Sequence, residues 1–167
     1  MKMTFVLAAL SAALLSSVPA QAGLWQTYAN ERFGATAEIP ATWKAGEPPE
    51  NGDGLEFTSP DGQSTVIVSG MLNIDDTLDE AFASREEAFE GETITYKHRD
   101  KHSVVVSGTK GDRIFYRKSL LACGNQVWVS VSIEYPVAQK QAFDAIVTHV
   151  AGSLKAGPSE QVAECNG

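Results

Sequence analysis

The chain has 167 residues, of which 43% are hydrophobic and 20% charged, and its formal net charge at pH 7 is -8. An acidic surface repels the phosphates of nucleic acids and the headgroups of anionic lipids. We therefore expect a globular protein with a sizeable core that binds neither nucleic acid nor a membrane surface.

The first 22 residues have the pattern of a secretory signal peptide. Lys2 precedes an apolar run from Phe5 to Leu15, and Ala20-Gln21-Ala22 is the small-x-small pattern that signal peptidase cuts after. The run is too short for a membrane anchor, which needs about 20 apolar residues. We expect cleavage after Ala22 and a periplasmic protein, with secretion beyond the periplasm as the alternative.

Residues 23–155 are expected to form a single α+β domain. A short strand is predicted from Phe33 to Ile39, and a loop rich in proline and glycine follows over residues 44–54. Residues 55–59 and 64–72 then predict a β-hairpin around Pro60-Asp61-Gly62, because proline presets φ and glycine accepts a positive φ.

An amphipathic helix is predicted from Thr77 to Glu90. Thr77 and Glu80 have the spacing of a capping box, which favours a helix start. Leu78, Phe82 and Phe89 fall near one face of this helix.

Three strands of an antiparallel meander are predicted next, over residues 92–98, 102–109 and 112–123. If Lys110-Gly111 forms a two-residue turn, Thr109 faces Asp112. That register places Val104, Val106 and Phe115 on one side of the sheet and leaves apolar residues on the other side too. A sheet that is apolar on both faces needs two covering layers.

Residues 126–135 predict a further strand, in which apolar side chains alternate with Trp128, Ser130, Ser132 and Glu134. Pro136 suits the first position of a C-terminal helix. Residues 156–167 are expected to be a tail that a Cys123–Cys165 disulfide pins, because an oxidising compartment favours pairing of the two cysteines. A redox-active or metal-binding thiol is the alternative, although the sequence has no C-x-x-C.

One stretch resembles a known family. Phe33-Gly34, a short strand and then Ile39-Pro40-Ala41-Thr42-Trp43 are similar to the opening of PsbP/Mog1-like domains, which include exported bacterial PsbP-like and DcrB-like proteins. The later order of elements is similar over nearly all of the mature chain. The resemblance implies a central antiparallel sheet with helices on both faces, an α/β/α sandwich. It also implies an accessory or binding role, and it carries no shared catalytic motif.

The stretch KHRDKH invites a metal hypothesis. A three-residue connection over residues 99–101 would place His98 opposite His102, with Asp100 at the tip as a doubtful third ligand. Three basic residues in the same stretch would repel a cation. We therefore favour a solvated charged turn and predict no metal site and no cofactor.

Three further groups of residues are candidates for a site, and each also has a structural interpretation. His149 is expected at the border of the buried side of the last helix, where a general base in a dispersed Ser/His/Asp site is the alternative. Acidic residues of the 47–61 region lack the spacing of an EF-hand calcium loop; they are Glu47, Glu50, Asp53, Glu56 and Asp61. Four aromatic residues could line a partner groove, although core filling is favoured; they are Trp25, Tyr28, Trp43 and Trp128.

These observations favour a non-catalytic periplasmic accessory or binding module that interacts with another envelope protein. A small hydrolase with a dispersed catalytic site is one alternative. A carrier of a metal or a small molecule is the other.

Overall fold

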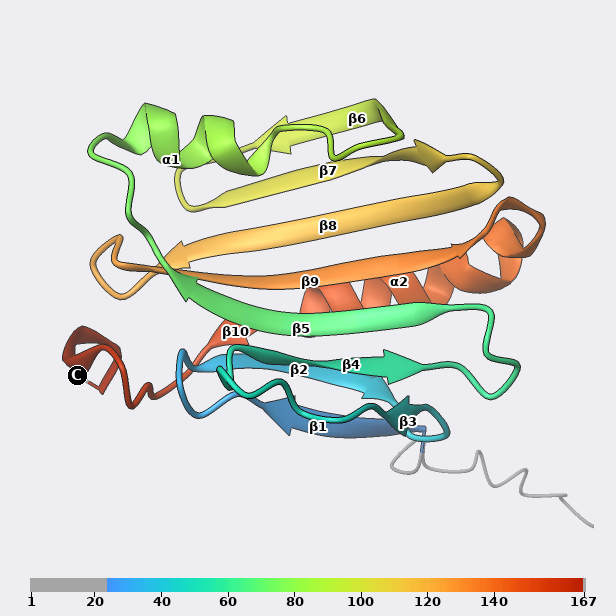
Figure 1. Cartoon of the computed structure of the whole chain (residues 1–167), viewed down its shortest axis with the longest axis horizontal. Coiled ribbons are helices and arrows are strands. Elements are labelled where there is room, and N and C mark those ends of the chain that lie inside the picture. The colour runs from blue at the N-terminus through green and yellow to red at the C-terminus, as the bar shows by residue number, and fades with distance from the viewer. Residues whose placement is uncertain (1–23, 167) are drawn as a thin grey trace, which may run out of the picture.

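The computed structural model describes residues 24–166, which form two sheets and two α-helices (Figure 1). The strands are β1 (Trp25–Ala29), β2 (Ala35–Pro40), β3 (Lys44–Ala45), β4 (Gly54–Thr58), β5 (Thr65–Leu72), β6 (Glu92–Arg99), β7 (Ser103–Lys110), β8 (Arg113–Ala122), β9 (Val127–Pro136) and β10 (Lys155–Ala156). The helices are α1 (Leu78–Arg85) and α2 (Lys140–Ser153), with short 3-10 turns at Val137–Gln139 and Ala163–Asn166.

The larger sheet has seven strands in the order β3-β4-β5-β9-β8-β7-β6, and all of its neighbours are antiparallel. The smaller sheet has the order β1-β2-β10. The predicted α+β class, the hairpin of β4 and β5 and the antiparallel meander from β6 to β9 are confirmed.

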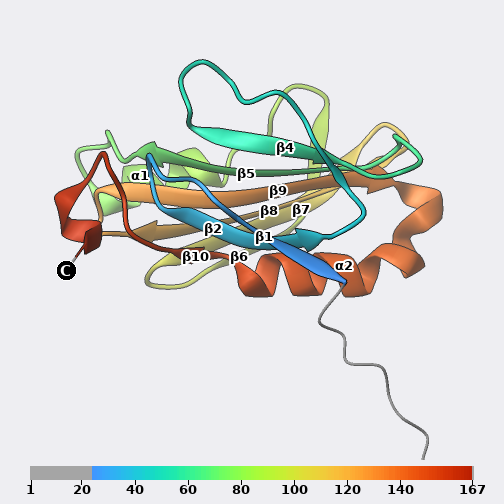
Figure 2. The ribbon, with the colours of Figure 1, turned by 90° about the horizontal axis from the view of Figure 1, so that it is seen from below.

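Strand β9 lies in the middle of the larger sheet, and both of its faces are covered. Val129, Val131 and Ile133 are fully buried in the cluster that contains Phe143 and Val150 of α2. Trp128 points to the opposite face and meets Phe82 of α1 edge to face, with ring centroids 5.2 Å apart. Figure 2 shows α2 and the smaller sheet on one side of the larger sheet. The predicted arrangement of helices on both faces is therefore confirmed.

Helix α1 begins as predicted but ends early. The capping box of Thr77 and Glu80 is present, and the helix ends at Arg85, not at Glu90. Phe82 is buried, whereas Leu78 and Phe89 are 50% and 60% exposed, so the predicted common face is wrong. The chain leaves the helix because tertiary partners bind its backbone beyond Arg85: Arg117 donates to the Glu87 carbonyl, and the Phe89 N–H donates to the Glu92 carboxylate.

The predicted turn between β7 and β8 is displaced by one residue, which shifts the pairing of the two strands by two residues. Lys110 pairs with Arg113, so the turn residues are Gly111 and Asp112, and Thr109 faces Ile114. Gly111 adopts the positive φ of 60° that the turn requires. A shift of two residues keeps each side chain on its own face, so the predicted set of Val104, Val106 and Phe115 still shares one buried cluster.

The last helix also begins later than predicted. Pro136 is the final residue of β9, and a 3-10 turn over Val137–Gln139 separates it from α2. Strand β1 was not predicted, since its side chains are half-buried or exposed and lack an apolar alternation.

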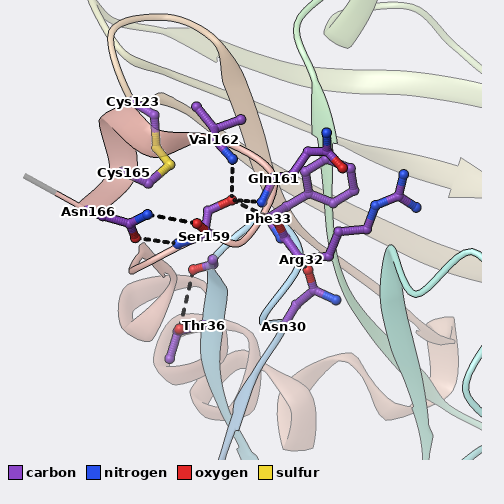
Figure 3. The surroundings of a disulfide bond; sticks show 11 residues. Asn30, Arg32, Phe33, Thr36, Cys123, Ser159, Gln161, Val162, Cys165 and Asn166 are labelled. Carbon is purple, nitrogen blue, oxygen red and sulfur yellow. Dashed lines mark hydrogen bonds between the residues drawn. A yellow bond between two sulfur atoms is a disulfide. The ribbon is translucent and has the colours of Figure 1, made fainter.

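The C-terminal segment packs back onto the start of the domain. Lys155 and Ala156 pair with β2, and Val162 joins the main core. The buried Ser159 hydroxyl donates to the Arg32 carbonyl at 2.6 Å and accepts from the Val162 N–H at 3.1 Å (Figure 3). The predicted Cys123–Cys165 disulfide is present beside this network.

The predicted signal peptide lies outside the described residues. Within residues 24–166, no helix has the length and apolarity that a membrane crossing requires.

The disulfide gives the first prediction. Replacing Cys123 and Cys165 together with serine is expected to lower the free energy of unfolding by up to about 4 kcal/mol, because it frees a loop of 42 residues in the unfolded chain. Urea unfolding at neutral pH measures the change. Reduction of the unmodified protein is the matched control and should give a similar loss. An unchanged midpoint in both samples would contradict the bond's stabilising role.

Candidate functional site

A pocket of about 410 Å³ lies on the α1 side of the larger sheet. Its floor consists of side chains from β5, β9 and β8, and its wall consists of the end of α1 and the segment that follows. This volume is within the range of pockets that bind small organic molecules, about 300 to 1,000 Å³.

The floor of the pocket follows from the alternation of β9. The valines of this strand point toward α2, so Ser130, Ser132 and Glu134 point to the pocket. Ser130 pairs with Ser119 of β8, and the two hydroxyl oxygens are 2.7 Å apart. The floor is therefore a row of small hydroxyl groups in the centre of the sheet.

An ion pair between Arg117 and Glu92 fixes one wall of the pocket. Arg117 Nη1 lies 2.6 Å and 2.7 Å from the two carboxylate oxygens of Glu92, and the two side chains are only 12% and 2% exposed. The Arg117 guanidinium also lies 4.1 Å from the ring centroid of Phe89. Burial alone would raise the pKa of Glu92, but the hydrogen bonds from Arg117 and from the Phe89 N–H outweigh it and lower that pKa.

Arg85 is the charged residue of the pocket that lacks an ion-pair partner among residues 24–166. It lies in the last turn of α1, where the helix dipole favours a cation. Its Nε is buried without a hydrogen-bond acceptor. Desolvation lowers the pKa of Arg85, and the charge of Asp75 offsets only part of this effect.

Trp128 adds a second unsatisfied donor to the same wall. Its side chain is fully buried, and its indole Nε1 has no acceptor within the described part of the chain. The guanidinium carbon of Arg85 lies 5.7 Å from the Trp128 ring centroid, so the two donor groups are neighbours. Buried donors without acceptors are costly, by about 1–3 kcal/mol each, and such groups call for a specific explanation.

The structure does not bring His98 and His102 together. His98 pairs with Val105, and Arg99 pairs with Val104, so the predicted opposition of the two histidines is wrong. Asp100 shapes the turn instead: its carboxylate accepts from the N–H groups of His102 and Ser103 and from the Ser103 hydroxyl.

The hydrogen bonds that Asp100 accepts from His102 and Ser103 lower its pKa. In residues 24–166 no three metal-binding side chains of the His, Cys, Asp or Glu type lie close enough to hold an ion, and this applies to the acidic 47–61 region as well. Asp61 there accepts hydrogen bonds from the Ser59 hydroxyl, the Gln63 N–H and Gln139, which lower its pKa.

His149 lies on the far side of the sheet from the pocket. Its ring stacks on Trp25, with centroids 3.6 Å apart, and its Nε2 lies 2.5 Å from a Glu38 carboxylate oxygen. Ser153 is close by, but its hydroxyl donates to the Val150 carbonyl and accepts from the Glu38 N–H. The serine proton is therefore directed to the helix backbone and not to the imidazole.

The four aromatic residues do not form a common groove. Trp43 is buried near Phe143 on the α2 side, and Trp128 is buried on the α1 side. Tyr28 packs edge to face on Phe57, and Trp25 stacks on His149. The alternative of a shared groove is therefore not supported, and the favoured prediction of core filling holds for Trp43 and Trp128.

The ion pair gives the second prediction. Glu92→Gln leaves Arg117 buried without its carboxylate and is expected to lower the free energy of unfolding by about 3 kcal/mol at pH 7. The pKa of Glu92 is lowered in the folded state, so this stabilisation is present above the ordinary glutamate pKa of about 4.3 and is lost as the pH falls through the lowered value. Urea unfolding from pH 7 to pH 3 should show that the difference in the free energy of unfolding between the unmodified protein and Glu92→Gln narrows below about pH 4.3.

Glu134→Gln is the matched control, because the side chains of the Arg113–Glu134 pair are 31% and 35% exposed and their charged atoms are 3.4 Å apart. This substitution should lower the free energy of unfolding by less than about 1 kcal/mol. Equal losses for the two variants would contradict the role given to Glu92.

The pocket was not predicted, although the sequence carried one signal for it. Serines at alternate positions of a strand with apolar neighbours on both sides indicate a face that a helix does not fill. The long-range contacts of Arg85, Glu92 and Arg117 have no such signal, because they depend on where α1 ends.

Comparison with known proteins places the fold. No protein-family model matches the chain, and no curated protein matches it. Among solved structures, cyanobacterial PsbP (CyanoP) from Synechocystis sp. PCC 6803 is similar over 88% of this chain and 98% of its own, with 12% identity and a TM-score of 0.58.

The Saccharomyces cerevisiae Ran-binding protein Mog1p is similar over 83% of this chain and 98% of its own, with 10% identity and a TM-score of 0.56. A mutant of Mog1 is similar over 79% of this chain, with 9% identity and a TM-score of 0.54. Over most of its length the chain thus has the fold shared by PsbP and Mog1, as its sequence predicted.

Proposed function

We propose that this protein is an exported, non-catalytic binding module, and that the pocket beside α1 holds a small organic ligand. The observation that carries the proposal is the polar pocket itself, in which Arg85 and Trp128 present donors that have no acceptor in residues 24–166. A bound ligand that accepts hydrogen bonds from the Arg85 guanidinium would pair this charge and offset its desolvation.

The positions of the histidines support binding over catalysis. The sequence has three histidines. His98 and His102 lie at the turn between β6 and β7, and His149 lies on α2 on the other face of the sheet. The pocket hydroxyls therefore lack the imidazole base that activates a serine nucleophile, and Ser119 and Ser130 bind each other. A binding role also agrees with the fold, because yeast Mog1p, which is similar in fold, is a Ran-binding protein.

The compartment is part of the proposal. The signal-peptide pattern over residues 1–22 supports export, and the Cys123–Cys165 bond adds weak support for an oxidising compartment. The periplasm is the proposed location and secretion the alternative.

A protein partner in the envelope is the second candidate function. Exposed apolar residues follow one another from the end of β5 to the start of α1, and Leu72, Ile74 and Leu78 are 39%, 82% and 50% exposed. A run of exposed apolar side chains is typical of a protein contact.

The partner hypothesis predicts a position-specific cross-link. A photoreactive phenylalanine analogue at position 74 should form an adduct of protein size in intact envelopes. The same analogue at position 137, another exposed apolar site, should not. Equal adducts at both positions, or none at either, would reject this second function.

The pocket hypothesis predicts uptake of a neutral aromatic probe. N-phenyl-1-naphthylamine should bind with an increase in fluorescence, and Ser132→Phe should weaken this binding by about tenfold or more because the new ring fills the floor. Thr27→Phe, on the exposed side of β1, is the matched control and should bind like the unmodified protein. Equal binding by all three proteins would show that the probe does not occupy the pocket.

A further inference from the structure

One charge of the pocket has no ion-pair partner. Two arginines and two glutamates line the pocket: Arg85, Glu92, Arg117 and Glu134. Glu92 pairs with Arg117, and Glu134 pairs with Arg113, which lies outside the lining. Arg85 is therefore the charged lining residue that has no ion-pair partner in residues 24–166, in a chain whose formal charge is -8.

Asp75 acts on Arg85 through its charge but does not form an ion pair with it. The Asp75 carboxylate instead accepts a hydrogen bond from the Ser84 hydroxyl at 3.3 Å. The floor of the pocket offers uncharged hydroxyl groups and the Glu134 carboxylate, which is paired with Arg113. A half-buried guanidinium of this kind is a ready partner for the carboxylate, sulfonate or phosphate group of a ligand.

The rest of the pocket is suited to an apolar body. Ile67 and Met71 of β5 and Phe89 after α1 line it, and they are 37%, 40% and 60% exposed. Phe89 is held in place because its ring lies against the Arg117 guanidinium. An organic molecule that reaches from these side chains to Arg85 would bury apolar area at one end and pair a charge at the other.

We propose that the pocket selects amphiphilic organic anions, with the Arg85 guanidinium binding the anionic head and Ile67, Met71 and Phe89 contacting the apolar body. This inference rests on the proposed function, since it assigns a ligand class to the same pocket. A neutral ligand of the same shape would leave Arg85 unpaired and is expected to bind more weakly.

Two dyes test the selectivity, because 8-anilino-1-naphthalenesulfonate is N-phenyl-1-naphthylamine with a sulfonate added. The unmodified protein should bind the sulfonate dye about tenfold or more tightly than the neutral dye, since a charge-assisted hydrogen bond contributes about 1.5–3 kcal/mol. Arg85→Gln should remove this preference, so that the ratio of the affinities for the two dyes falls to about one. Arg85→Lys should retain part of the preference, because the charge remains but the planar fork is lost.

Arg99→Gln is the matched control, because Arg99 also lies against α1, 4.2 Å from the Phe82 ring centroid, but does not line the pocket. It should keep the full preference for the sulfonate dye. The unmodified protein gives a second measurement that needs no variant: octanoate should displace the neutral dye at concentrations at which 1-octanol does not.

The outcomes separate the two proposals. If both dyes bind with equal affinity, if Arg85→Gln leaves the sulfonate dye's affinity unchanged, or if octanol competes as well as octanoate, the anion selectivity is wrong and the pocket function stands. If Ser132→Phe leaves the binding of both dyes unchanged, the dyes bind elsewhere and the proposed function itself fails.

Discussion

The structure depends on one strand, β9, which is paired along both edges and covered on both faces. The valines of β9 are buried on the α2 side, and Trp128 is buried on the α1 side. A strand in this position cannot slip by one residue, because every side chain would then point to the wrong layer. The register of β5 and β8 follows from it, and so does the placement of both helices.

The two helices that cover this sheet, α1 and α2, differ in length, and this difference creates the pocket. Helix α2 has 14 residues and α1 only 8, whereas β8 and β9 have 10 residues each. At 1.5 Å per residue α1 spans about 12 Å, and a ten-residue strand spans about 33 Å. The part of the face that α1 does not reach is where β9 carries serines in place of apolar residues. The serines of β9 and the short length of α1 therefore both identify the same part of the sheet as the part that stays open to solvent.

Local patterns in the sequence predicted most of the fold. The alternation of residues 126–135, the capping box at Thr77 and the Pro60-Asp61-Gly62 turn each act over a few residues, so they are visible without the tertiary structure. The end of α1 was not predictable, because distant groups such as Arg117 bind the backbone that would have continued the helix. The same is true of the pocket, whose lining comes from segments that are spread along the chain from Ile67 to Glu134.

The bond between Cys123 and Cys165 closes a covalent ring that contains all of β9 and α2. Tension applied to the chain beyond Cys165 is therefore carried through the sulfur atoms to the β8–β9 turn and does not pass along the covalent chain of α2. The middle strand and its covering helix lie inside a loop that bears no pulling load. A force applied to the chain beyond Cys165 can therefore leave the packing of β9 against α2, on the side of the sheet opposite the pocket, unchanged.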